Sequence, residues 1–320
     1  MGITIALFLS SLVLSLLLTP SVSKLGTRYG FVDHPSERKV HNRLIPRIGG
    51  VAIYISFFLP FIGFLFYSNP FSEQFFTGRF FWLFAGATLI FLMGLLDDIL
   101  GLGPNVKFAV QIVSALLACQ GGLRISAVTL PWGPTFLLDW LAVPVTVFWF
   151  LLVVNAINLI DGLDGLAAGI TLFVSLTLLL LNVINGNFLT SIGLAAIAGA
   201  SCGFLFFNFS PASIFMGDSG SYLLGFLIAS LSLLGSFKSQ TAFAILIPVI
   251  ALGVPLFDAI LAPIRRFIFG KKLFSPDKGH IHHKLLSLGL TQRNVVLIIY
   301  ASTVCLSCFG LLLAQVTAVR

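Results

Sequence analysis

The stretch WLAVPVTVFWFLLVVNAINLIDGLDGLAAG, residues 140–169, decides the fold. Residues 140–157 carry no charge, and a membrane-spanning α-helix needs about 20 predominantly apolar residues. Apart from Thr146, polar side chains appear only where this run ends, in NAINLIDGLDGLAAG (residues 155–169). The stretch therefore predicts a helix that crosses a membrane and finishes in a polar loop.

The rest of the chain repeats this pattern. It is 58% hydrophobic and 9% charged, with a mean hydropathy of +1.06, which excludes an ordinary soluble domain. Comparable apolar runs lie near residues 3–22, 49–67, 79–96, 106–120, 140–157, 166–184, 188–207, 219–235, 241–262 and 294–316. Strands of a membrane barrel need only about 9–11 alternating residues. We therefore expect an all-α integral membrane protein, a single domain over residues 1–320 with about ten transmembrane helices.

The charges predict how these helices are oriented. If ten helices cross the membrane, fourteen of the 18 lysines and arginines fall on one side, which the positive-inside rule places in the cytoplasm. Both termini then face outward. We expect a multi-pass protein of the cytoplasmic (inner) membrane, with its active site facing the cytoplasm. Nine of the 11 acidic residues share the cytoplasmic side. A face with both signs fits a metal and phosphate site better than a purely basic lipid-binding patch.

Asp97 and Asp98 lie in MGLLDDILGLG, at the cytoplasmic end of the third predicted helix. The helix dipole disfavours carboxylates at a C-terminus, so another group should hold them there. One carboxylate could act on a metal or nucleophile while the other positions its neighbours. The alternative is a solvated helix end.

Asn155, Asn158, Asp161 and Asp164 recur every third residue, so a helical portion presents them along one side. The glycines between them let the backbone come close to a ligand. The alternative is a polar turn with Asp164 at the start of the next helix, where the dipole favours it. That alternative explains one aspartate and not the whole series.

Asp218, in NFSPASIFMGDSGSYLLGF, begins another predicted helix, where an N-cap is the simple interpretation. It nevertheless brings a third acidic loop to the same face. Oxygen ligands without nearby thiols suit Mg²⁺ or Mn²⁺, and Mg²⁺ is usually held by one or two carboxylates together with substrate phosphates. We expect Asp97, Asp98, Asp161, Asp164 and Asp218 to surround one site.

The last cytoplasmic loop, RRFIFGKKLFSPDKGHIHHKLLSLGL (residues 265–290), combines bases with His280, His282 and His283. These side chains can donate to a phosphate-rich substrate. A zinc site is the rival interpretation, although no nearby thiol completes a familiar ligand set. A basic juxtamembrane loop is another alternative, which leaves three histidines within four residues unexplained.

Two further features are predicted. Asp258, inside the ninth apolar run, is expected to pair with Arg265 or Arg266 rather than line the site. The longest outer loop, from Gly121, has the glycine, proline and β-branched residues of a short hairpin.

Four segments together resemble the polyprenyl-phosphate N-acetylhexosamine-1-phosphate transferases of glycosyltransferase family 4. They are HPSERKVHNRLIPRIGG, LLDDILGL, NAINLIDGLDGLAAG with MGDSGSYLLG, and HIHH. The resemblance covers nearly the whole chain in the family's order, with ten helices and outward-facing termini as in that family.

The resemblance implies transfer of a sugar 1-phosphate from a UDP-sugar to undecaprenyl phosphate, with release of UMP and a requirement for Mg²⁺. It assigns Asp218 to the magnesium ion, Asp97 and Asp98 to the catalytic aspartate pair, and Lys107 to the diphosphate. It also assigns Asn155, Asn158, Asp161, Asp164 and His280 to substrate binding, and His282 and His283 to catalysis.

HIHH resembles the enzymes that use UDP-GlcNAc to start O-antigen of lipopolysaccharide, teichoic acid or related polymers. The peptidoglycan enzyme, which takes UDP-MurNAc-pentapeptide, more often carries three consecutive histidines, and Ile281 departs from that pattern. That reaction is the first alternative. An ion-coupled transporter is the second, although a transporter would place charges nearer the bilayer midplane. No nucleic-acid partner is expected, and related membrane enzymes can dimerise, so a homodimer is a further hypothesis.

Overall fold

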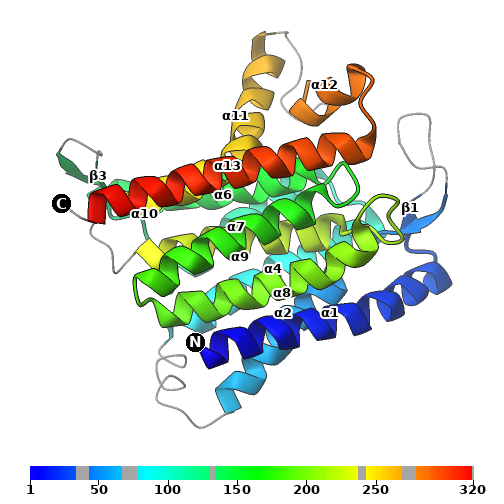
Figure 1. The fold of residues 1–320 in the computed structure, drawn as a ribbon, viewed down its shortest axis with the longest axis horizontal. Coiled ribbons are helices and arrows are strands. Elements are labelled where there is room, and N and C mark those ends of the chain that lie inside the picture. Colours follow the sequence, from blue (N-terminus) through cyan, green and yellow to red (C-terminus); the bar gives the residue numbers. More distant parts are fainter. Residues whose placement is uncertain (34–42, 67–77, 130–133, 237–242, 269–278, 319–320) are drawn as a thin grey trace.

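The computed structural model of the chain describes residues 1–33, 43–66, 78–129, 134–236, 243–268 and 279–318. Most of these residues form long helices that run side by side (Figure 1). Part of HPSERKVHNRLIPRIGG, all of GKKLFSPDK (residues 270–278), the last residue of the second apolar run and the first two residues of the ninth lie outside the described residues.

The elements follow one another along the chain with short connections. The helices are α1 (Gly2–Tyr29), α2 (Gly50–Phe66), α4 (Arg79–Leu100), α5 (Pro104–Gln120), α6 (Ala142–Ile160), α7 (Leu166–Ile184), α8 (Phe188–Asn208), α9 (Gly217–Ser236), α10 (Phe243–Ala251), α11 (Gly253–Ile268), α12 (Ile281–Ser287) and α13 (Gln292–Ala318). The strands are β1 (Val32–Asp33), β2 (Ile45–Pro46), β3 (Ala127–Thr129) and β4 (Thr135–Leu137), and a short 3-10 helix spans Asp139–Leu141.

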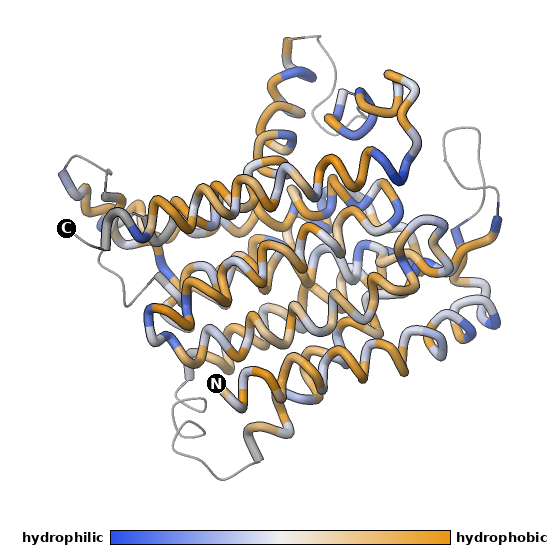
Figure 2. Tube along the Cα trace, viewed as in Figure 1, coloured by the Kyte–Doolittle hydropathy of each residue, from blue (hydrophilic) through white to orange (hydrophobic). Residues whose placement is uncertain are grey.

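Hydropathy along the helices is that of a membrane protein. Seven described helices are long and apolar enough to cross a bilayer, and α2 contributes a shorter apolar helix, Gly50–Phe64. Hydrophobic residues predominate along the middle of the helices, and hydrophilic residues are more frequent toward the helix ends (Figure 2). The predicted class, an all-α multi-pass membrane protein, is confirmed.

The two ends of the bundle differ. Both termini and the β3–β4 hairpin lie at one end, whereas β1, α12 and the last turn of α1 lie at the other (Figure 1). The hairpin predicted after Gly121 is confirmed, with Val128 opposite Phe136 in an antiparallel pair. The predicted acidic loops follow α4 and α6 and precede α9, so they belong to the end that carries α12.

The ninth apolar run was predicted to be one helix, and this is wrong. The helix breaks at Leu252 into α10 and α11, and α11 projects from the bundle (Figure 1). Pro255 lacks the N–H that would donate to the carbonyl of Ala251, and glycine, here Gly253, is unfavourable within a helix. The break directs α11 toward α12.

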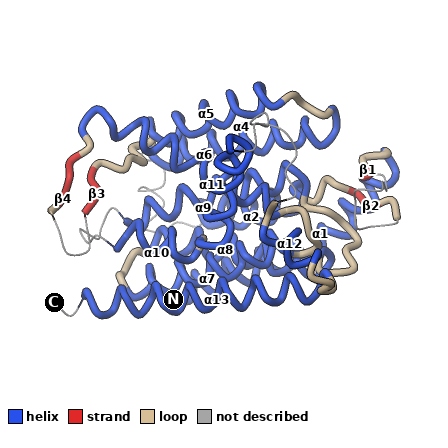
Figure 3. The backbone as a smooth tube through the Cα atoms, turned by 90° about the horizontal axis from the view of Figure 1, so that it is seen from above, coloured by secondary structure: helices blue, strands red, loops and turns tan. Residues whose placement is uncertain are grey.

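Helix α9 lies in the middle of the bundle, between α5 at one edge and α13 at the other when seen from above (Figure 3). It packs against α4 and α6, and the indole N–H of Trp149 donates to the carbonyl of Ala229 at 3.3 Å. The start of α2 is bonded to the segment that leads into α9, since the N–H of Gly50 donates to the carbonyl of Met216 at 2.8 Å. This packing fixes the end of α9 that carries Asp218.

The contact between α2 and α9 requires glycine. A Cβ on Gly50 would lie 2.3 Å from the backbone nitrogen of Gly220, whereas a Cβ on Gly63 of the same helix meets nothing within 4 Å. We expect Gly50→Ala to lower the stability by about 1–3 kcal/mol through overpacking. Gly63→Ala should leave it unchanged or raise it, since alanine favours the helix. Thermal unfolding of the two purified variants in detergent measures the difference, and equal melting temperatures would contradict this packing.

Candidate active site

Asp98 joins the end of α4 to the start of α9. Its carboxylate accepts the backbone N–H groups of Asp218 at 2.8 Å and Ser219 at 3.0 Å, and the hydroxyl of Ser219 at 2.6 Å. An anion at the N-terminus of a helix satisfies donors that have no partner within the helix. The position of Asp98 at the C-terminus of α4 is unfavourable for a carboxylate, and the donors at the start of α9 compensate for it.

Arg47, just after β2, is the second partner of Asp98, with a nitrogen 3.1 Å from a carboxylate oxygen. Partial burial acts to lower the pKa of Arg47, but the charge of Asp98 raises it above its ordinary value, so the guanidinium stays charged. The backbone passes closely here, because Gly217 has a φ of +73° and a Cβ on it would lie 2.2 Å from the carbonyl oxygen of Arg47. Arg47 was not singled out from the sequence, although it lies within a segment that carried the family resemblance.

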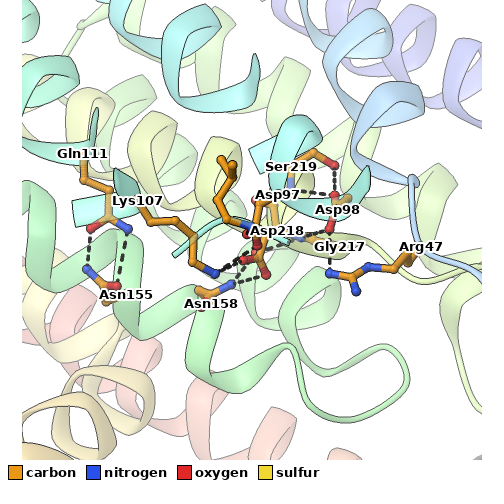
Figure 4. A network of polar contacts seen from close by, with 12 residues as sticks. Arg47, Asp97, Asp98, Lys107, Gln111, Asn155, Asn158, Gly217, Asp218 and Ser219 are labelled. Atoms are coloured by element: carbon orange, nitrogen blue, oxygen red, sulfur yellow. Dashed lines mark hydrogen bonds and ion pairs between the residues drawn. The ribbon is translucent and has the colours of Figure 1, made fainter. Parts of the chain in front are cut away.

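Lys107, in the first turn of α5, lies between two carboxylates (Figure 4). Its ammonium is 2.9 Å from Oδ2 of Asp97 and 3.1 Å from Oδ2 of Asp218. The other oxygen of Asp97 accepts the backbone N–H of Leu102 at 2.6 Å. Three predicted site residues from α4, α5 and α9 are therefore in direct contact.

The series of asparagines on α6 divides between two places. Asn158 donates to Oδ1 of Asp218 at 3.0 Å and lies 3.0 Å from the hydroxyl of Ser221. Asn155 instead pairs with Gln111 of α5, donating to its side-chain oxygen at 2.8 Å, and lies apart from the aspartates (Figure 4). Asn158 thus orients Asp218, whereas Asn155 joins α5 to α6.

Asp161 and Asp164 lie in the turn between α6 and α7. Burial raises the pKa of Asp161 well above its ordinary value, and the negative charges of Asp218 and Asp98 act in the same direction. Asp164 accepts the backbone N–H of Ala212 at 3.0 Å, which ties this turn to the segment between α8 and α9. Asp161 therefore belongs electrostatically to the aspartate cluster, and the contact of Asp164 is with the neighbouring loop.

The three histidines at the start of α12 form one cluster. The rings of His280 and His282 are parallel within 2°, with centroids 5.7 Å apart, and His282 and His283 are 4.4 Å apart. His282 faces the α6–α7 turn, since a Cβ on Gly162 would lie 3.4 Å from its Nε2. Burial first, and then the neighbouring histidines, lower the pKa of His282 to about 4, so its imidazole is neutral at physiological pH.

Asp258 on α11 forms the predicted pair with Arg265, at 3.6 Å. It also lies 3.1 Å from Nδ1 of His280 and accepts the backbone N–H of Ile281 at 3.2 Å. The prediction of a simple pair is therefore incomplete, because the same carboxylate reaches the histidine cluster. The proline-induced break before α11 places it there.

The aspartate cluster has the donors that a magnesium ion prefers. Oxygens of Asp97 and Asp218 converge on one point, now the position of the Lys107 ammonium. The three carboxylates of Asp97, Asp98 and Asp218 outnumber the two cations bonded to them, Lys107 and Arg47. Within the described ranges, no three His, Cys, Asp or Glu residues are grouped as a metal site. Two carboxylates that approach one point match the usual way in which Mg²⁺ is held together with substrate phosphates.

The residues of this site lie in a region that matches a known protein family. The sequence model of glycosyl transferase family 4 matches residues 80–236, which include both aspartates of α4, Lys107, the asparagine series and Asp218. A Bacillus subtilis protein named "Probable undecaprenyl-phosphate N-acetylglucosaminyl 1-phosphate transferase" is 43% identical over 92% of this chain and 80% of its own length. The chain belongs to glycosyl transferase family 4.

Other members of the family are similar over the same extent. The decaprenyl-phosphate N-acetylglucosaminephosphotransferase of Mycobacterium tuberculosis is 37% identical over 91% of this chain and 78% of its own length. The undecaprenyl-phosphate alpha-N-acetylglucosaminyl 1-phosphate transferase of Thermotoga maritima is 31% identical over 93% and 87%. The resemblance to the N-acetylglucosamine branch of the polyprenyl-phosphate transferases is confirmed.

The geometry separates the roles of the two neighbouring aspartates. Asp98→Asn leaves donors at the start of α9 without a charged acceptor, and we expect a loss of about 1–3 kcal/mol of stability. Asp97→Asn should be less destabilising, because Lys107 keeps its contact with Asp218. Thermal unfolding in detergent compares the two variants. If Asp97→Asn melted at the lower temperature, the assignment of Asp98 as the residue that joins α4 to α9 would be wrong.

Proposed function

We propose that the protein transfers N-acetylglucosamine 1-phosphate from UDP-GlcNAc to undecaprenyl phosphate, releasing UMP, and so starts a cell-envelope polysaccharide. The observation that carries this proposal is the contact of Asp97, Lys107 and Asp218 at the N-terminus of α9, within the region that matches the family. The names of the relatives support the sugar and the polyprenyl acceptor.

The membrane setting suits one lipid substrate and one water-soluble substrate. We propose that ten helical segments cross the cytoplasmic membrane, with both termini outside and the aspartate cluster at the cytoplasmic boundary. The distribution of lysine and arginine supports this orientation. A site at the ends of the helices is within reach of a lipid phosphate in the inner leaflet and of a nucleotide sugar in the cytoplasm.

The reaction exchanges one phosphoanhydride bond for another. An oxygen of the lipid phosphate forms a bond to the phosphorus attached to GlcNAc, and the bond from that phosphorus to the bridging oxygen breaks, so UMP leaves with that oxygen. Such transfers depend on positioning and charge neutralisation. Both oxygens of Asp97 accept hydrogen bonds, one from the backbone of Leu102 and one from Lys107, which holds this carboxylate in place beside Asp218.

The residues divide the remaining work. Asp218 and Asp97 would hold Mg²⁺, or Mn²⁺ in its place, which when bound neutralises the charge of the diphosphate. Lys107 adds a positive charge beside the same phosphates, and Asn158 keeps the Asp218 carboxylate in place. His280, His282 and His283 supply nitrogen donors and acceptors opposite the α6–α7 turn, where the sugar phosphate would lie.

The activity is tested directly with purified protein, Mg²⁺, undecaprenyl phosphate and a panel of UDP-sugars. We expect UMP release to be fastest with UDP-GlcNAc and to stop when the lipid is left out. Release with UDP-MurNAc-pentapeptide alone would assign the peptidoglycan reaction instead. If folded protein released UMP from none of the UDP-N-acetylhexosamines, the transferase proposal would fail.

The metal role of Asp218 is tested by Asp218→Asn. Loss of the charge should lower turnover by more than about 100-fold, since a fixed charge that stabilises the transition state commonly contributes that much. Added Mg²⁺ should not restore it. Asp139→Asn, at the end with the hairpin, is the matched control and should turn over like the wild type. Near-normal turnover of Asp218→Asn would remove this residue from the metal site.

A further inference from the structure

Asp258 is a buried carboxylate outside the aspartate cluster, with only 2% of its surface exposed. We propose that Asp258 is a positioning residue of the transfer reaction, which fixes the imidazole of His280 and thereby orients the histidine cluster toward the sugar phosphate. The effect of Asp258 on turnover rests on the function proposed above. Its effect on the position of the histidines concerns only α11 and α12.

A single oxygen of Asp258 holds two groups at the start of α12. Oδ2 lies 3.1 Å from Nδ1 of His280 and accepts the backbone N–H of Ile281 at 3.2 Å. The negative charge of a carboxylate 3.1 Å from Nδ1 favours the proton on that nitrogen, which leaves Nε2 of the same ring for a phosphate oxygen or its proton. The orientation of the ring and the start of the helix are thus set by the same group.

The second oxygen of Asp258 faces Arg265, at 3.6 Å on the same helix. A buried carboxylate is tolerated when an opposite charge and hydrogen-bond donors surround it. Arg265 therefore allows Asp258 to remain ionised between α11 and the histidines. The charged and titratable groups of this cluster are Asp258, Arg265, His280, His282 and His283.

The position of His280 is passed on to the site by ring stacking. The His282 ring lies parallel to that of His280, and its Nε2 faces Gly162 in the α6–α7 turn. A rotation of the His280 ring therefore disturbs His282 and its contact with the turn that carries Asp161. The contacts run from Asp258 through His280 and His282 to the proposed sugar-phosphate loop.

Helix α12 needs such an external contact. It is only seven residues long, and an isolated helix of that length is not stable in water. It packs against α13, and its first backbone donor is accepted by Asp258. The carboxylate of Asp258 consequently joins α11 to the histidines, although residues 269–280 separate α11 from α12 in the chain.

The kinetic test uses Asp258→Asn, Asp258→Glu, His280→Ala and the double variant of Asp258→Asn with His280→Ala. We expect Asp258→Asn to lower kcat of UMP release about 10- to 100-fold, as loss of a group that orients a functional histidine commonly does. KM for UDP-GlcNAc should change less than about 3-fold, and Asp258→Glu should recover part of kcat. The double variant should be about as slow as His280→Ala alone, because the two residues act through one ring.

A second measurement does not depend on turnover. Diethylpyrocarbonate modifies accessible neutral imidazoles, and mass spectrometry gives the rate for each histidine of the substrate-free protein. We expect Asp258→Asn to raise the rates at His280 and His282 several-fold, with less change in Asp258→Glu. Asp139→Asn is the matched control and should label like the wild type.

The two measurements separate the possible failures. Unchanged labelling in Asp258→Asn, a wild-type kcat in that variant, or losses that multiply independently in the double variant would each overturn the positioning role. If Asp258→Asn does not fold, wild-type labelling and kcat in both Asp258→Glu and His280→Ala overturn it. If the wild type released no UMP, the proposed function would fail, while labelling would still decide whether Asp258 fixes the histidines.

Discussion

The buried carboxylate of Asp98 is the contact on which the rest of the site depends. It ends α4 and begins α9 in one hydrogen-bonded group, and Arg47 closes that group from β2. Because the N-terminus of α9 is fixed in this way, Asp218, in the first turn of that helix, faces Lys107 and Asp97. The end of α4 and the starts of α5 and α9, which are distant in sequence, therefore meet at one position. The carboxylates there outnumber the two cations, Lys107 and Arg47, that are bonded to them.

The aspartates and asparagines have different tasks despite their similar chemistry. The carboxylate of Asp98 accepts a backbone N–H of α9, and that of Asp164 accepts a backbone N–H of the segment between α8 and α9. Asp97 and Asp218 share a cation, which is the arrangement that a diphosphate with a divalent metal ion can occupy. The residues that hold the fold and those proposed for chemistry thus lie within hydrogen-bonding distance of one another.

The fold class and most of the site could be predicted from the sequence. Long uncharged runs indicate membrane helices, and acids at their ends indicate a common face, because such residues are costly within a bilayer. The division of the asparagine series could not be predicted, since Asn155 finds Gln111, a neutral residue on another helix. The contacts of Asp98 with Arg47 and of Asp258 with His280 also escaped prediction, because helix packing and the break at Leu252 bring these residues together.

We propose that one divalent ion and the diphosphate share the carboxylates between α4 and α9. Anomalous scattering of Mn²⁺ in an experimental structure with UDP-GlcNAc bound tests this arrangement. We expect one manganese peak, in contact with the Asp218 carboxylate and the diphosphate and close to Asp97, with Lys107 moved toward the phosphates. A peak bound by the histidines of α12, or a nucleotide sugar held away from the start of α9, would contradict it.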